Sequence, residues 1–166
     1  MLKSIDSVNE YVGKATAWLT AFLTILICYN VAMRYMFSNS EAWRTELEWH
    51  IFALIFLLGA GYALKHDKHV RVDLFYANFS PKRKALVDLV GTIIFLIPWC
   101  LIIIFTSYEY AYNAWLIDEG SPDGGLPARY LIKFAITLGM FLLLLQAIAL
   151  SIKSFQTLIL RKTDDK

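Results

Sequence analysis

Long stretches without a charged residue constrain this chain more than any other feature of its sequence. Four such runs cover residues 15–33, 49–64, 89–108 and 134–152. About 20 apolar residues in a helix cross the ~30 Å hydrocarbon core of a bilayer. Three runs have 19, 20 and 19 residues, whereas the second has 16, includes His50, and needs its flanks to span. The sequence therefore predicts an all-α membrane protein, a single domain with four transmembrane helices over residues 1–166.

The overall composition supports a lipid environment. Hydrophobic residues make up 58% of the chain and charged residues only 18%. Soluble domains carry about 25% charged and 45–50% apolar residues, and a domain of this size leaves much of its surface exposed. Membrane strands are not expected, because the apolar runs are continuous rather than alternating. The net charge of +2 gives no indication of a nucleic-acid-binding surface.

The first run has one alternative interpretation, a cleaved signal peptide. Its apolar stretch is too long for such a peptide, and the small residues at 15–17 lie at its start instead of following it. We therefore expect residues 15–33 to remain as a membrane span.

The distribution of positive residues predicts the topology. Twelve of the 16 Lys and Arg residues lie in the N-terminal tail, in 65–88 and after residue 152. The segments 34–48 and 109–133 hold the other four, together with seven acids. The positive-inside rule then predicts cytoplasmic N- and C-termini, with the 34–48 and 109–133 loops on the outer side.

Local signals refine the second half of the chain. Ser80 and Pro81 form a helix start, with Ser as the N-cap and Pro at the first helical position. A helix from there to about Tyr112 would be roughly 48 Å long, so it should tilt or project, and Pro98 should bend it. Residues 121–125 read as a turn.

A short interfacial helix is expected before the third span. Its apolar residues follow the i, i+3, i+4, i+7 pattern at Val72, Phe75, Tyr76 and Phe79. This spacing is typical of a helix lying on the membrane surface.

Polar groups inside the runs are few and uncharged. They include Asn30, Gln146 and a row spaced by four residues, Thr16, Thr20, Thr24 and Cys28. This row indicates either a substrate path or a close-packed helix face, and packing is favoured because small residues and shared hydrogen bonds are typical of helix contacts in membranes. The glycines Gly59, Gly61 and Gly139 are expected to serve the same purpose.

No cofactor or metal site is expected. The histidines, His50, His66 and His69, do not form facing pairs inside spans, as haem would need. The cysteines Cys28 and Cys100 are single and lie within runs, unlike the exposed pairs of a thiol oxidoreductase. An intramembrane protease would need a base close to a serine, and no histidine is placed for it. We therefore expect a protein that is not an enzyme.

The loop after the first run allows two interpretations. In one, Arg34 snorkels while Tyr35 and Trp43 anchor at the membrane interface. In the other, the loop is a structured docking element in which Arg34 pairs with Glu46 or Glu48. Composition alone leaves both open.

Several motifs together resemble one family. They are Arg34-Tyr35-x-Phe37-x-x-Ser40-x-x-Trp43-x-x-Glu46-Leu47, then Leu58-Gly59-Ala60, then His69-Val70-x-Val72-Asp73. In this order, on four spans, the chain resembles the small membrane subunit (DctQ-like) of tripartite ATP-independent periplasmic (TRAP) transporters. It departs from the pattern at Thr45, where the family often has a second acid.

The resemblance implies a multi-pass protein of the bacterial inner membrane. Its partners would be a large multispanning permease subunit, in a one-to-one complex, and a periplasmic substrate-binding protein that docks transiently, with membrane lipid around them. Together they would take up a small organic acid, driven by an ion gradient with sodium as the expected ion. The small subunit would be a four-helix bundle that braces the large one, without a substrate site.

The resemblance also implies roles for six residues. Those expected to structure the outer docking side are Arg34, Tyr35, Trp43 and Glu46. His69 and Asp73 would organise the cytoplasmic surface helix. The alternative function is a self-sufficient homodimeric exporter, which would need an intramembrane carboxylate that the four runs do not contain.

Overall fold

The computed structural model describes residues 2–66, 76 and 79–164, and all regular structure in these ranges is helical. The helices are α1 (Leu2–Phe37), α2 (Ala42–Lys65), α4 (Pro81–Gly91), the π-helix η1 (Thr92–Leu96), α5 (Ile97–Leu116) and α6 (Tyr130–Asp164). Four stretches are long and apolar enough to cross a membrane, since α4, η1 and α5 form one continuous span. The prediction of an all-α protein with four transmembrane helices is confirmed.

Each helix extends beyond its uncharged run. The run 15–33 lies inside a 36-residue helix, and the run 49–64 inside a 24-residue helix. Backbone hydrogen bonding can continue where a helix leaves the apolar layer, so charged residues limit the span without ending the helix. The extensions place polar residues of neighbouring helices side by side beyond the apolar runs.

The third span begins as predicted and contains a π-helical turn. The Ser80 hydroxyl accepts a hydrogen bond from the Arg83 backbone N–H, and Pro81 occupies the first turn. The helix ends at Leu116, four residues beyond the expected Tyr112. The π-turn lies directly before Pro98, which has no N–H to donate to the preceding turn, and such irregular turns are known sites of helix bending.

The predicted interfacial helix falls mostly outside the described residues, Val72 and Phe75 included. Of its four apolar positions, only Tyr76 and Phe79 are described. The Tyr76 hydroxyl donates to Asp88 of α4 at 2.8 Å. This contact ties residue 76 to the start of the third span.

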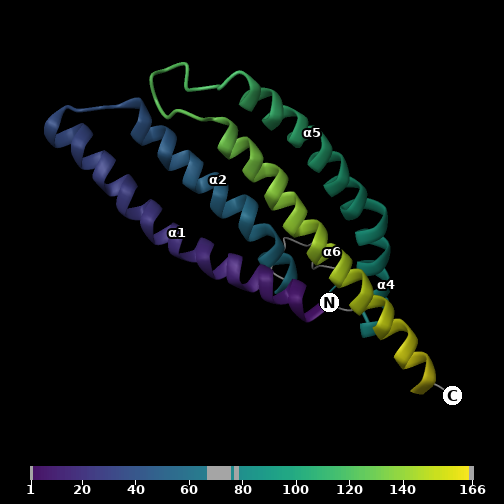
Figure 1. The fold of residues 1–166 in the computed structure, drawn as a ribbon. Coiled ribbons are helices and arrows are strands. Elements are labelled where there is room, and N and C mark those ends of the chain that lie inside the picture. Colours follow the sequence, from purple (N-terminus) through teal and green to yellow (C-terminus); the bar gives the residue numbers. More distant parts are fainter. Residues whose placement is uncertain (1, 67–75, 77–78, 165–166) are drawn as a thin grey trace.

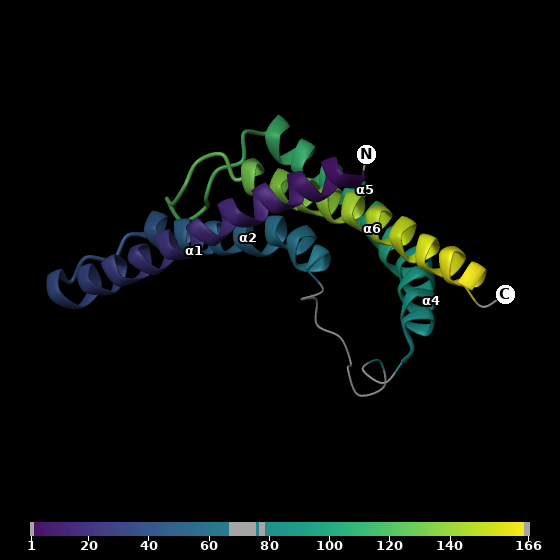
Figure 2. The ribbon, with the colours of Figure 1, turned by 90° about the horizontal axis from the view of Figure 1, so that it is seen from below.

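The four spans lie in one curved layer (Figures 1 and 2), in the order α1, α2, α6, α5. Helix α2 packs between α1 and α6, and α6 packs between α2 and α5. The expectation of a four-helix bundle is therefore wrong. A bundle surrounds a common core, whereas here each span is buried mainly along its seams with neighbouring helices.

Glycines create the close contacts along these seams. A Cβ atom added at Gly139 of α6 would lie 2.7 Å from the Leu57 carbonyl oxygen of α2. One added at Gly61 of α2 would lie 2.2 Å from Asn9 Oδ1 of α1. The predicted packing role is confirmed for these two glycines. A Cβ added at Gly59 would have a single neighbour at 3.9 Å, which is an ordinary contact, so packing does not require a glycine at this position.

The predicted packing row on α1 is wrong beyond its first member. Thr16 is 5% exposed, but Thr20, Thr24 and Cys28 are exposed. A step of four residues turns 400°, so each step rotates about 40° away from the seam. The buried positions instead follow steps of four, four, three, seven and seven residues, which keep them close to one face: Ile5, Asn9, Gly13, Thr16, Leu23 and Asn30.

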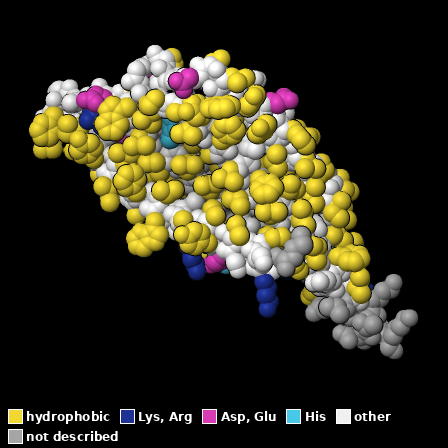
Figure 3. All heavy atoms as spheres, viewed as in Figure 1, with side chains coloured by type: hydrophobic (Ala, Val, Ile, Leu, Met, Phe, Trp, Pro, Cys, Tyr) yellow, Lys and Arg dark blue, Asp and Glu magenta, His cyan; other side chains and the backbone are white. Residues whose placement is uncertain are grey.

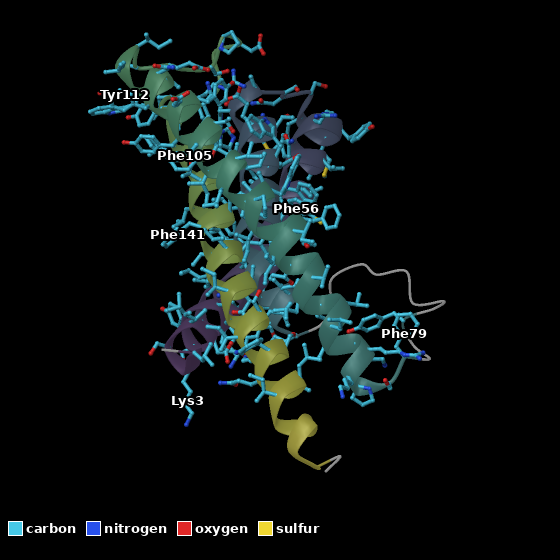
Figure 4. The ribbon with its side chains drawn as sticks, turned by 90° about the vertical axis from the view of Figure 1, so that its right-hand side faces the viewer. Lys3, Phe56, Phe79, Phe105, Tyr112 and Phe141 are labelled. Atoms are coloured by element: carbon cyan, nitrogen blue, oxygen red, sulfur yellow. The ribbon has the colours of Figure 1, made fainter. Side chains whose placement is uncertain are left out.

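The outer surface of the layer suits a membrane. Figure 3 shows hydrophobic side chains over the middle of the helices, with the charged side chains near the two ends. Figure 4 places Phe105 and Phe141 on one side of the layer and Phe56 on the other. All three are exposed, so the layer presents apolar side chains on both of its faces.

Candidate docking surface and the contacts that hold it

The two ends of the layer contain different parts of the chain. The connections 38–41 and 117–129 lie together at one end, here called the loop end (Figure 1). The opposite end, here called the terminal end, carries the start of α1, the end of α2 and the end of α6. Of the six predicted site residues, four lie at the loop end, and His69 and Asp73 lie outside the described residues.

Glu46 anchors the connection between α5 and α6. It lies on the first turns of α2 and is 8% exposed. The Ser121 hydroxyl donates to one carboxylate oxygen, and the Leu126 backbone N–H donates to the other at 2.7 Å. A Cβ at Gly125 would lie 2.2 Å from the same carboxylate, so glycine allows this approach. Glu46 thus holds a loop that is about 75 residues away in sequence.

The predicted pairing of Arg34 with Glu46 or Glu48 is wrong. Glu46 is occupied by the loop, and Glu48 accepts a hydrogen bond from Asn30 Nδ2 at 2.7 Å. Arg34 is exposed in the last turn of α1 and forms no ion pair with any residue that the structure describes.

Arg44, which the sequence analysis did not select, holds the 38–41 connection. Its side chain is 2% exposed, and Nη2 donates to the Asn39 carbonyl oxygen at 3.1 Å and to Asn39 Oδ1 at 2.5 Å. Ser38 adopts a positive φ of 51°, which turns the chain at the end of α1. The 38–41 connection is therefore held by Arg44 and not by Arg34, the arginine that was expected to structure it.

The two predicted aromatic residues remain on the surface. Tyr35 is 80% exposed. Trp43 is also exposed, and its indole Nε1 donates to the Glu41 carboxylate. This hydrogen bond, together with the nearby charge of Arg44, lowers the pKa of the Glu41 carboxyl below its ordinary value. These side chains form the outward part of the loop end.

A second set of contacts fixes the base of the 117–129 connection. Lys133 of α6 pairs with Glu119 at 2.6 Å, and its ammonium lies 3.9 Å from the centre of the Tyr110 ring. The Arg129 N–H donates to the Glu119 carbonyl oxygen at 2.9 Å. The predicted turn at 121–125 is confirmed, with the Ser121 N–H bonded to the Leu126 carbonyl and a positive φ at Gly124. The loop end is therefore one braced surface.

At the terminal end, a polar junction joins α1 to α6. Asn9 is fully buried, and its Nδ2 donates to Gln146 Oε1 at 3.0 Å. Gln146 Nε2 donates to Asp6 at 3.2 Å, and Lys153 reaches the same carboxylate at 2.7 Å. These contacts cross about 140 residues of sequence.

A second polar group joins α1 to α2. Glu10 accepts from Lys65 Nζ at 2.6 Å and lies 2.8 Å from His66 Nε2. The sequence alone did not assign His66 a partner. A cluster of Asp, Asn and Glu at positions 6, 9 and 10, beside the first span, was the signal that could have indicated these junctions.

These arrangements define a class of membrane protein. The polar side chains tie helix ends and loops to each other, and the four runs between them contain no Asp, Glu, Lys or Arg. In the ranges that the structure describes, no three His, Cys, Asp or Glu side chains converge in a way that would hold a metal ion. The fold is thus a multi-pass membrane layer with one braced loop surface.

Comparison with known families specifies this class. Residues 23–157 match the family described as tripartite ATP-independent periplasmic transporters, DctQ component. The chain belongs to this family, as its motifs predicted. The family is a component of transporters rather than a family of enzymes, and with four apolar helices it makes the chain a multi-pass protein of the inner membrane.

Individual relatives agree with this assignment. The chain is 25% identical over 160 residues to the C4-dicarboxylate TRAP transporter small permease protein DctQ of Vibrio cholerae serotype O1, covering 83% of this chain and 67% of that protein. It is 26% identical over 125 residues to the "Putative TRAP transporter small permease protein" of Haemophilus influenzae, covering 73% of this chain and 76% of that one.

Proposed function

We propose that this chain is the scaffold subunit of a TRAP transporter that takes up a small organic acid, driven by an ion gradient with sodium as the coupling ion. It packs one-to-one against the large transport subunit and helps to dock the periplasmic binding protein. The single observation that carries the scaffold role is the uncharged, single-layer arrangement of the four spans.

A layer of this kind is suited to be the fixed part of a transporter, against which another part moves. Alternating access moves one part of a transporter against a fixed part. Glycine contacts at the α1–α2 and α2–α6 seams, and polar junctions at both ends, restrict sliding of these helices. Ionisable groups inside a membrane typically mark substrate and ion pathways, and the four runs contain no Asp, Glu, Lys or Arg, so transport belongs to the large subunit.

The loop end is the proposed docking side. Its two connections are held by Glu46, Arg44 and Lys133, while Arg34, Tyr35 and Trp43 remain exposed on it. The excess of positive residues at the other end supports cytoplasmic termini and a periplasmic loop end. A braced surface loses little conformational entropy on binding, which favours docking of a soluble protein.

Deletion of the gene for this chain tests the function. The deletion strain should fail to grow on one acid from a panel of C4-dicarboxylates, 2-oxo acids and sialic acid as carbon source, and a plasmid copy should restore growth. C4-dicarboxylates head the panel because the Vibrio cholerae relative carries that substrate in its name. Normal growth on every member would contradict a role in organic acid uptake.

The homodimeric exporter remains the second candidate, and the purified chain tests it. In liposomes without any partner, the chain should transport none of the panel acids. Transport by the chain alone would overturn the scaffold proposal, because a scaffold has no pathway of its own.

A further inference from the structure

One face of the layer contains an apolar groove near the loop end. It lies between α2 and α6, with one side chain from α5, and has a volume of about 460 Å³. Ligand sites for small molecules usually span ~300–1,000 Å³. Its lining residues are Trp49, Phe52, Ala53, Phe56, Leu57, Tyr110, Arg129, Ile132, Lys133 and Ile136. The groove follows α2 from Trp49 to Phe56, about 10 Å at 1.5 Å per residue.

The walls and the mouth of this groove differ in chemistry. The deeper positions are apolar, with Phe52 and Phe56 exposed along the rim. The mouth carries two cations from the first turn of α6 and its approach, Arg129 and Lys133. An apolar slot with cations at one end is the pattern that recognises an amphiphile.

The two cations at the mouth are not equivalent. Lys133 already pairs with Glu119 and is largely buried. Arg129 has its guanidinium 5.9 Å from the centre of the Trp49 ring and forms no ion pair within the described part of the chain. The Arg129 charge acts on the Glu46 carboxylate at longer range, but the hydrogen bonds of Glu46 come from Ser121 and Leu126. Arg129 is therefore the group available for an external anion.

The position of the mouth matches the level of a lipid headgroup. Aromatic residues with polar tips collect near membrane–water interfaces. The loop-end turns of α2 and α5 carry Trp49, Tyr108, Tyr110, Tyr112 and Trp115. A phosphate at Arg129 would lie at this belt, and an attached acyl chain would run into the apolar layer along α2.

We propose that this groove is a binding site for one glycerophospholipid, with an acyl chain between α2 and α6 and the phosphate on the Arg129 guanidinium. Arginine suits this role because its fork of N–H groups binds a phosphate through two hydrogen bonds. The lipid would fill the open side of the α2–α6 seam, where a single layer lacks a second layer of helices. The site does not depend on the transport function proposed above.

Native mass spectrometry of the full chain in mild detergent tests the proposal. The wild-type chain should retain one phospholipid, and Arg129→Gln should bind phosphatidylglycerol about tenfold more weakly, because the phosphate loses its charged hydrogen bonds. Arg34→Gln is the matched control, since it removes the same charge at the same end outside the groove, and it should bind like wild type. Ala53→Phe should also weaken binding by filling the groove, with folding checked by circular dichroism.

Three probes separate the lipid from other occupants. Diacylglycerol, which has the chains without the phosphate, should bind as weakly to wild type as phosphatidylglycerol binds to Arg129→Gln. Inorganic phosphate at millimolar concentration should not displace the lipid. The lipid should remain bound after co-purification with a large permease subunit; its loss there would mean that a protein segment fills the groove.

Trp49 gives an independent readout. Phosphatidylglycerol with a brominated acyl chain should quench the fluorescence of wild type more than that of Trp49→Phe, because Trp49 lines the groove. Equal quenching of the two, or equal lipid retention by Arg129→Gln and Arg34→Gln, would overturn the proposal.

Discussion

Single residues at the loop end hold connections that their neighbours in the sequence do not indicate. The sequence analysis selected Glu46, but its partners, Ser121 and Leu126, come from a loop that composition could not place beside it. Arg44 was missed because a buried arginine next to a span looks the same in sequence as a solvated one. Charge type is visible in a sequence, whereas the choice between Arg34 and Arg44 depends on which way a helix end faces.

Replacing Glu46 by Gln should loosen the 117–129 connection. The variant loses the charge that strengthens both hydrogen bonds, so the backbone amides of this loop should exchange with deuterium about tenfold faster. Glu41→Gln is the control, because Glu41 binds Trp43 rather than the loop. Equal exchange in the two variants would contradict the anchoring role.

Replacing two helical glycines by alanine should have opposite effects on the stability of the protein. Gly139→Ala places a Cβ 2.7 Å from the Leu57 carbonyl and should cost about 1–3 kcal/mol. Gly91→Ala has nothing within 4 Å and should stabilise its helix by about 0.5–1 kcal/mol. Denaturant unfolding in detergent, followed by circular dichroism, measures both. A stable Gly139→Ala variant would mean that the α2–α6 seam is less close than described.

At the scale of helices, uncharged runs predicted where the spans lie but not where the helices end. The helix α1 begins 13 residues before its run, because lost hydrophobicity does not break backbone hydrogen bonds. The cap at Ser80 was predictable because it depends on adjacent residues. The junctions of α1 with α2 and α6 were not, since they join residues far apart in sequence.

The Asn9–Gln146 contact should couple α1 to α6 energetically. In a double-mutant cycle, Asn9→Ala and Gln146→Ala should be non-additive by about 0.6 kcal/mol, a typical value for hydrogen bonds between membrane helices. As a control, Ser7→Ala and Thr157→Ala should be additive, because each hydroxyl bonds to its own helix. Additive effects for the first pair would show that the junction does not join the helices.

At the scale of the whole molecule, the layer arrangement is the feature that the sequence could not supply. Four apolar helices in this order are equally compatible with a closed bundle. The distinction depends on which faces meet, and the drift of the threonine row on α1 shows how spacing alone misplaced one of them. Both faces of the open layer carry exposed apolar side chains, as surfaces in contact with lipid or with another membrane protein do.

Disulfide trapping distinguishes a layer from a bundle. In a chain carrying Cys28→Ser and Cys100→Ala, the pair Ser107→Cys and Thr137→Cys should cross-link, because the hydroxyls of α5 and α6 lie 2.8 Å apart. The pair Thr24→Cys and Thr106→Cys should not, because α1 and α5 lie at opposite edges of the layer. Cross-linking of the second pair in membranes would favour a closed bundle.

The central claim is that this layer is one part of a larger transporter. Its most direct test is a mild-detergent pull-down of the full chain from its native membranes, with the partners identified and their ratio measured by mass. A much larger multispanning protein should be recovered in a one-to-one ratio. Recovery of a homodimer with no larger partner would contradict the claim and would favour the self-sufficient exporter.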